Sequence, residues 1–288
     1  MRALVVLELR SIQGLGCPVL EELVAMLSDC PKLHTLRLVD LRTFTARSEQ
    51  LLNQGFIILP CLKLLQIEIP GGQALAELLA VIQPGELELD VRLSIGPIDG
   101  GPVLRNAQSL LRRSNVVSLT LADFRSPNID HFQSFFSSMP YLRGLRINST
   151  GAGSLLSALA NEAVAESLSN LQSLCISDGE VDSPLLNRII AFVEVRPLHS
   201  LFFWSCRFPS FYNEQEGTDE GEDLGMNDDH IDGNQNFIPG SPLYHKDTPY
   251  RARTFLLEHV ERLVVCETPP VSIVNGVDVS VQEMIKTS

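Results

Sequence analysis

The chain has 288 residues, of which 44% are hydrophobic and 20% are charged. This composition supplies enough apolar side chains for a continuous core, so it excludes disorder of the whole chain. The longest apolar stretch, 55–62, contains Pro60 and is followed by Lys63, and it is too short for a membrane span, which needs about 20 residues. The apolar run after Arg2 stops at Glu8, which argues against a secretory signal.

The net charge of −13 is concentrated in one segment. Nine carboxylates lie between Glu214 and Asp232, and no Lys or Arg occurs from Phe208 to His245. Subtracting these nine negative charges leaves −4 for the rest of the chain. Nucleic acid requires a basic surface, so we expect no nucleic-acid partner. Residues 207–250 are expected to form an acidic, flexible insertion, because they cannot bury enough apolar surface to become ordered.

The cysteines indicate the redox environment. None of the six belongs to a CxxC pair, and six in a chain of this length do not form a disulfide framework. We therefore expect reduced thiols and a cytoplasmic or nuclear protein that does not enter a membrane.

Aliphatic residues with the spacing LxxLxL recur along the chain. Successive copies are separated by 29, 29, 54, 26, 29 and 27 residues. The seven clear copies are Leu4–Leu7–Leu9, Leu33–Leu36–Leu38, Leu62–Leu65–Ile67, Val116–Leu119–Leu121, Leu142–Leu145–Ile147, Leu171–Leu174–Ile176 and Leu198–Leu201–Phe203. Weaker copies are Leu87–Leu89–Val91, which divides the long interval, and Val260–Leu263–Val265. A period of about 20–29 residues is typical of leucine-rich repeats.

Helical periodicity fills the intervals between these copies. Apolar residues recur with helical spacing over 19–27, 74–82, 129–136 and 185–190. Pro18 suits the first turn of the first helix, and Ser183 and Pro184 suit the N-cap and first position of the last. Proline also directly precedes four of the expected strands, at Pro31, Pro60, Pro140 and Pro197.

Strand and helix thus alternate seven to nine times, which predicts an α/β leucine-rich-repeat solenoid, or horseshoe, with a concave parallel sheet and convex helices. We expect an array of seven to eight repeats over 1–206, and a final repeat with a C-terminal tail over 251–288. A doubly wound α/β sheet is the alternative, but its strands are usually continuous apolar runs. The first strand begins without a polar capping element, so we expect the N-terminal end to be weakly stable or prone to aggregation.

The repeats resemble those of ribonuclease inhibitor and of F-box/leucine-rich-repeat proteins. Leu198–Leu201–Phe203–Cys206–Phe208 matches the cysteine-containing form LxxLxLxxCxL. The phrases CPKLHTLRL, LPCLKLLQI and MPYLRGLRI are similar to the divergent F-box-associated repeats common in fungi. In the other copies the Asn or Cys position is taken by different residues: Ile12, Leu41, Phe124, Thr150 or Gly179.

This resemblance implies the substrate-recognition part of an F-box-type ubiquitin ligase. In that family the F-box binds a Skp1-type adaptor and the repeats hold the substrate. No F-box precedes Leu4, so a Skp1-type adaptor is expected only if an upstream F-box exists. The alternative is a GTPase-regulating or inhibitor-like repeat protein, since these share the repeat length.

Signatures of catalysis and of metal binding are weak. Asp228-x-His230-x-Asp232 begins like a calcium loop, but Pro239 occupies the position that needs a bidentate Glu. The histidines show no HExxH spacing, and no GxSxG turn occurs. We therefore expect no catalytic residue, cofactor or metal site. An enzyme with an unrecognised site is the second alternative.

The remaining candidate site is the concave face, which carries the residues that flank the second and third leucine of each copy. We predict that it binds another protein, and that Phe202 and Trp204 are the main anchors, because aromatic side chains dominate binding hot spots. In the competing interpretation, the segment after Cys206 folds back and covers both rings. The candidate contact residues are Arg37, Gln66, Thr120, Arg146, Asn148, Phe202 and Trp204.

Overall fold

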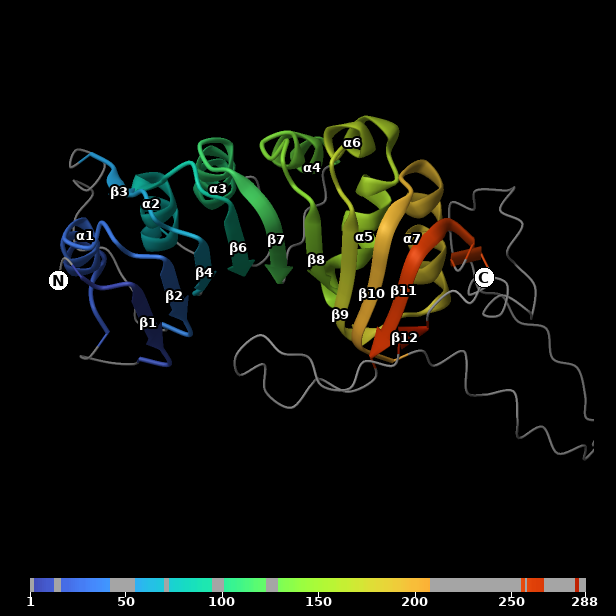
Figure 1. The fold of residues 1–288 in the computed structure, drawn as a ribbon, viewed down its shortest axis with the longest axis horizontal. Helices are drawn as coiled ribbons and strands as arrows, with labels where there is room; N and C mark the ends of the chain where they lie inside the picture. Colours follow the sequence, from blue (N-terminus) through green and yellow to red (C-terminus); the bar gives the residue numbers. More distant parts are fainter. Residues whose placement is uncertain are drawn as a thin grey trace, which may run out of the picture.

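A computed structural model describes residues 3–12, 17–41, 55–69, 73–94, 101–122, 129–207, 255–256, 258–266 and 283–284. Within these ranges the protein has an α/β fold. Its strands form one large sheet, and its helices lie along one side of that sheet (Figure 1).

The large sheet has ten strands, in the order β1-β2-β4-β6-β7-β8-β9-β10-β11-β12. All neighbours are parallel except β11 and β12. The order follows the sequence without reversal, which excludes the doubly wound alternative, where the order reverses at a switch point. The strands are β1 (Val6–Arg10), β2 (Thr35–Val39), β4 (Leu64–Glu68), β6 (Leu89–Ser94), β7 (Val116–Ala122), β8 (Gly144–Asn148), β9 (Ser173–Glu180), β10 (Leu198–Arg207), β11 (Val260–Cys266) and β12 (Glu283–Met284).

Helices connect most of the consecutive strands. The neighbours α2 and α3 contact each other, as do α5 and α7. The helices are α1 (Leu20–Ser28), α2 (Gln73–Val81), α3 (Pro102–Arg112), α4 (Ile129–Phe136), α5 (Ser149–Leu159), α6 (Glu162–Ser167) and α7 (Ser183–Val195). The sequence predicted the positions of α1, α2, α4 and α7; it predicted helices in the other repeats as well, but did not give the positions of α3, α5 and α6. A small parallel sheet of β3 (Ile57–Leu59) and β5 (Ile82–Pro84) was not expected either.

The core lies between the sheet and the helices. In β2, Leu36 and Leu38 are fully buried, whereas Arg37 between them is half-buried. The same alternation recurs in β4 and β8. The second and third positions of the LxxLxL copies therefore point towards the helices, and the flanking residues point to the opposite face.

The weak copy Leu87–Leu89–Val91 was assigned in the wrong register. Leu87 is 42% exposed, and the buried residues of β6 are Leu89, Val91 and Leu93. The pairing of β6 with β7 shifts between Leu89 and Asp90. The first two inward residues of this strand, Leu89 and Val91, are thus two positions apart, whereas the first two leucines of LxxLxL are three positions apart.

Two helix starts also differ from the prediction. The N-cap of α7 is Asp182, whose Oδ1 accepts a hydrogen bond of 2.8 Å from the Leu185 N–H, so Ser183 is already helical. The α1 helix begins at Leu20, and Pro18 therefore lies before it. Of the expected acidic insertion 207–250, only Arg207 belongs to the described residues, as the last residue of β10.

Gly85 marks a close approach between two chain segments. A Cβ atom at this position would lie 2.8 Å from the Pro60 Cα, nearer than real Cβ contacts allow. We predict that Gly85→Ala lowers the free energy of unfolding by about 1–3 kcal/mol, because backbone must shift to admit the methyl group. Urea unfolding measures the change. Gly101→Ala is the control, since a Cβ atom there meets nothing within 4 Å, and an equal loss in both variants would contradict the prediction.

Candidate functional site

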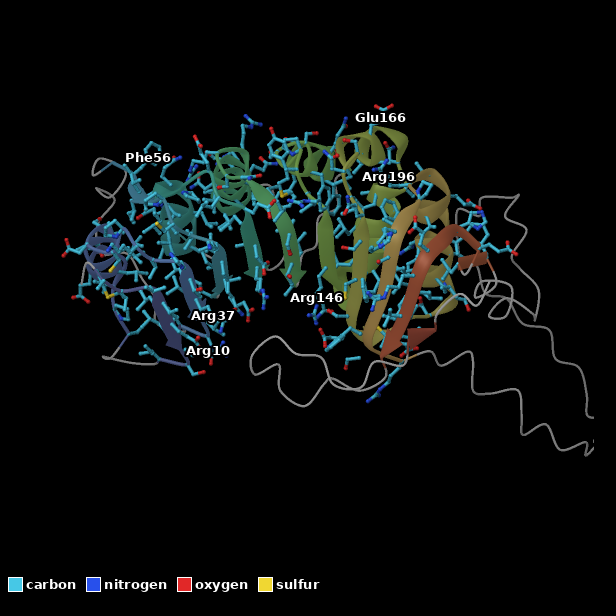
Figure 2. The ribbon with its side chains drawn as sticks, viewed as in Figure 1. Arg10, Arg37, Phe56, Arg146, Glu166 and Arg196 are labelled. Carbon is cyan, nitrogen blue, oxygen red and sulfur yellow. The ribbon has the colours of Figure 1, made fainter. Side chains whose placement is uncertain are left out.

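We call the sheet surface turned away from the helices the open face. Figure 2 shows Arg10, Arg37 and Arg146 on the lower side of the molecule, whereas Glu166 of α6 lies on the opposite side. The strand registers align the open-face side chains in rows across the sheet. The middle row runs Glu8, Arg37, Gln66, Arg92, Thr120, Arg146, Cys175, Phe202 and Val264.

The first strands of the open face carry charges that neutralise one another. Glu8 forms ion pairs with Arg10 and with Arg37 of the next strand, the latter at 3.2 Å. On β4, the amide of Gln66 donates a hydrogen bond of 2.6 Å to Glu68. These pairs are half exposed, so they contribute little to stability, but they leave this part of the face polar and near neutral.

The same arrangement continues on β6 and β7. Arg92 pairs with Asp90 at 3.1 Å, and the Ser118 hydroxyl donates to the other oxygen of Asp90 at 3.3 Å. Thr120 lies beside Arg92 in the register and also beside Arg146. Thr120 therefore lies between the charged residues of β1 to β6 and the side chains around Arg146, which are described next.

Aromatic and cationic side chains meet on β8, β9 and β10. The guanidinium carbon of Arg146 lies 5.8 Å from the centre of the Trp204 ring, within cation–π range. Arg146 Nε also donates to the Ser177 hydroxyl at 3.3 Å, and its Nη2 lies 3.7 Å from Asp178 Oδ2. The arginine is thus held by a hydroxyl and a carboxylate of β9 while it faces the indole of β10.

Phe202 has a cationic neighbour of its own. The guanidinium carbon of Arg262 on β11 lies 5.8 Å from the centre of the Phe202 ring. Beyond Phe202 in the same row, Val264 is only 2% exposed. The two aromatic rings, both half-buried, therefore lie between a polar stretch of the open face and a buried apolar position.

The predicted contact residues fall into two groups on this one face. Arg146, Asn148, Phe202 and Trp204 come together on β8 and β10 around β9. Arg37 and Gln66 are neighbours on β2 and β4, with Thr120 on β7 between the groups. All seven side chains are half-buried.

Sequence reasoning did not name Asp90, Arg92, Arg262 or Asp178, which take part in these contacts. Arg92 flanks Val91 in a weak copy of the repeat, and the flanking residues of the weak copies were not taken up as candidates. Arg262 could have been found, since it precedes Leu263 in the weak copy of the repeat and so belongs to the same face. Asp178 carried no sequence signal, because its place depends on a left-handed backbone conformation with φ of 56°.

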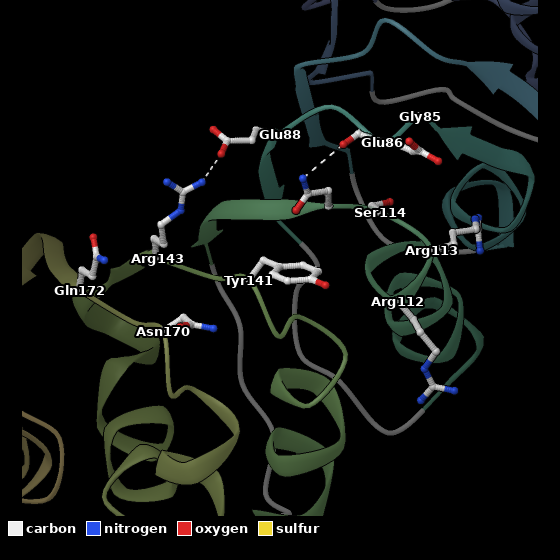
Figure 3. Close-up of a pocket in the computed structure, with 11 residues that line it drawn as sticks. Gly85, Glu86, Glu88, Arg112, Arg113, Ser114, Tyr141, Arg143, Asn170 and Gln172 are labelled. Carbon is white, nitrogen blue, oxygen red and sulfur yellow. Dashed lines mark hydrogen bonds and ion pairs between the residues drawn. The ribbon is translucent and has the colours of Figure 1, made fainter.

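A cavity of about 830 Å³ lies at the amino ends of β6 to β9, away from the predicted site (Figure 3). Glu88 and Arg143 form an ion pair there, and the Asn115 amide donates to the Glu86 carbonyl at 3.2 Å. Tyr141, 61% exposed, also lines the cavity. The loops that form it follow no LxxLxL spacing, so no sequence pattern indicated it.

Arg113 also borders this cavity, but its guanidinium has a structural role. It donates to the carbonyls of Leu79, Ala80 and Ile82 where α2 ends, at distances of 2.6 to 3.0 Å. Burial lowers the pKa of this arginine from its ordinary value. Its Nη1 donates to the Ser109 hydroxyl of α3 at 2.8 Å, so its donors are engaged within the protein and not by a ligand in the cavity.

Cys206 occupies the cysteine position of the repeat pattern and is buried at the end of β10. Its thiol donates to the Ile176 carbonyl of β9 at 3.4 Å, which links the two strands where they leave the sheet. Burial raises the pKa of this thiol to about 12, and nearby Cys175 and Asp178 act in the same direction. A buried donor of this kind is structural and poorly nucleophilic.

Neither a metal site nor a membrane helix is found in the described part of the chain. Its His, Cys, Asp and Glu residues form no group of three or more that could hold a metal ion. None of its helices is both long enough and apolar enough to cross a membrane.

No protein-family model matches the sequence, and no curated protein is significantly similar to it.

The raised pKa of Cys206 predicts slow modification of its thiol. At pH 8 a shift from 9.0 to about 12 lowers the thiolate fraction by about a thousandfold, so alkylation of native Cys206 should slow by about that factor. Mass-spectrometric mapping of timed iodoacetamide reactions measures each site. Half-buried Cys175 is the internal comparison, and denatured protein gives the unperturbed rate. If Cys206 reacts as fast in the native protein as in the denatured protein, the assignment fails.

Proposed function

We propose that this protein is a leucine-rich-repeat solenoid that binds another protein through its open face and catalyses no reaction itself. The strand order supports the repeat assignment, because every strand from β1 to β11 in the large sheet carries one LxxLxL copy or its shortened form. In such a solenoid the helices form the convex side and the open face is concave. The side chains of the open face are then available together to one partner.

The observation that carries the binding proposal is the pairing of each aromatic ring with an arginine. Trp204 faces Arg146 and Phe202 faces Arg262, and the four residues lie on β8, β10 and β11, within four adjacent strands. Tryptophan and arginine are enriched among residues that dominate binding energies. Rigid rings held by neighbouring cations lose little conformational freedom when a partner covers them. The remaining predicted residues, Arg37, Gln66, Thr120 and Asn148, would supply polar contacts around this centre.

The partner class follows from the resemblance of the repeats, and we propose the substrate of an F-box-type ubiquitin ligase. A Skp1-type adaptor would join the complex through an F-box encoded upstream. The alternative, a GTPase-regulating or inhibitor-like protein, predicts binding to a small GTPase or to an enzyme. Co-purification with a ubiquitin-ligase adaptor favours the first proposal, and retention on an immobilised GTPase favours the second.

We place the protein in the cytoplasm or nucleus. The support is the state of its cysteines, since none of Cys17, Cys30, Cys61, Cys175 and Cys206 forms a disulfide. Reduced thiols without disulfides are typical of these compartments.

Trp204→Ala tests the binding site. Loss of a hot-spot tryptophan should weaken binding by about 2 kcal/mol, or roughly thirtyfold, while the melting temperature changes little. Proteins captured from cells by the wild type and lost with Trp204→Ala are purified, and their affinities for both are measured by calorimetry. Tyr141→Ala is the matched control, because Tyr141 is an exposed aromatic residue outside the open face and its loss should leave binding unchanged.

The covering interpretation predicts the opposite result for the same variant. A tryptophan buried under a cap would cost about 3–5 kcal/mol of stability when replaced by alanine. A large drop in melting temperature with unchanged affinity would therefore reject the binding site and support the cap.

A further inference from the structure

The two edges of the large sheet differ in how their last strands are paired. At one edge, β12 pairs antiparallel with β11 through Leu263–Met284 and Val264–Glu283. At the other edge, β1 pairs with β2, and none of the described residues pairs with its outer side. An unpaired edge strand offers a row of free N–H and C=O groups to another strand.

The core is also less covered at the β1 edge. Leu7 and Leu9 point inward like Leu36 and Leu38 of β2, yet they are only partly buried, whereas the β2 pair is fully buried. Val6, at the start of β1, is 53% exposed. A neighbouring strand on this edge would cover the inward leucines.

The hydrogen bonds of β1 show which of its backbone groups have no partner among the described residues. The Val5 carbonyl accepts from the Thr35 N–H at 3.1 Å, and the Ser11 N–H donates to the Val39 carbonyl at 2.9 Å. Backbone groups alternate sides along a strand, so the odd-numbered residues of β1 face β2. The N–H and C=O groups of Val6, Glu8 and Arg10 therefore face the outer edge.

We propose that a second copy of this chain pairs with this edge, antiparallel, and joins the two sheets into one. In an antiparallel pair, opposite residues that both direct their backbone groups at the partner exchange two hydrogen bonds. Glu8 and Arg10 both do so. The pairing places Glu8 opposite Arg10 of the second copy, with Leu9 on the two-fold axis.

Charge complementarity selects this partner and this register. Glu8 and Arg10 are two residues apart on the open face and have opposite charges. The two-fold axis therefore creates two attractive contacts, one between Glu8 of each copy and Arg10 of the other. An axis at Glu8 would instead set two glutamates opposite each other, which is unfavourable. The strand thus carries a sequence that is complementary to itself.

Sedimentation velocity of the full chain over a wide concentration range tests the proposal. We expect a reversible dimer that is weakened roughly tenfold by Arg10→Glu and by Glu8→Arg, because each substitution sets like charges opposite each other twice. An equimolar mixture of the two variants should restore the dimer as a heterodimer, since one chain then presents two acidic side chains at these positions and the other presents two basic ones.

Arg92→Glu is the matched control. Asp90 and Arg92 form the same acid–base pair at the same spacing, but on β6, which has neighbours on both sides. This variant should dimerise like the wild type, and circular dichroism shows whether all variants are folded. A monomer at every concentration, a dimer insensitive to Arg10→Glu, a mixture that stays monomeric, or open-ended aggregates would each overturn the proposal.

Discussion

The in-register stacking of inward aliphatic side chains determines the rest of this structure. Because side chains alternate along a strand, a slip of one residue would move every leucine to the open face and every polar residue into the core. The inward row therefore fixes which residues share the open face and which are neighbours across strands. It runs Leu7, Leu36, Leu65, Val91, Leu119, Leu145, Leu174, Leu201 and Leu263.

The sequence predicted the strands and the face on which each strand residue lies, because both follow from this periodicity, and it predicted little else. All nine aliphatic copies became strands, and their flanking residues share one face. The β6 copy was misplaced because its spacing is shorter by one residue, and the position of α5 was not predicted because Ser, Thr and Gly make up much of its sequence and favour helices weakly. The pairing of Arg146 with Trp204 depends on side-chain rotamers and on the twist between strands, which no spacing encodes.

Left-handed residues connect the stacked core to the candidate site. Ser11, Asp40, Asp178 and Ser205 all have φ between 51° and 56°, and all occupy the same place, directly after the last open-face residue of a copy. Few residues other than glycine accept this conformation, and aspartate is among those that do. Ser11 and Asp40 directly follow the ends of β1 and β2, whereas Asp178 and Ser205 lie within β9 and β10. At Asp178 this conformation also places a carboxylate beside Arg146. The left-handed backbone conformation at residue 178 thus favours an aspartate, and the carboxylate of this aspartate is one of the groups that orient Arg146.

Edge pairing and partner binding use different ends of the open face, so the proposed dimer leaves the aromatic centre around Phe202 and Trp204 free. The edge contact uses the backbone of β1 with the side chains of Glu8 and Arg10, whereas the aromatic centre lies on β10, seven strands away in the sheet order. At about 4.8 Å per strand, the centre is about 34 Å from the β1 edge, measured along the sheet. A two-fold axis at that edge would place two aromatic centres about 70 Å apart, measured along one continuous surface. Such a dimer would favour partners that are themselves dimeric or repetitive, because binding at one centre raises the effective concentration at the other.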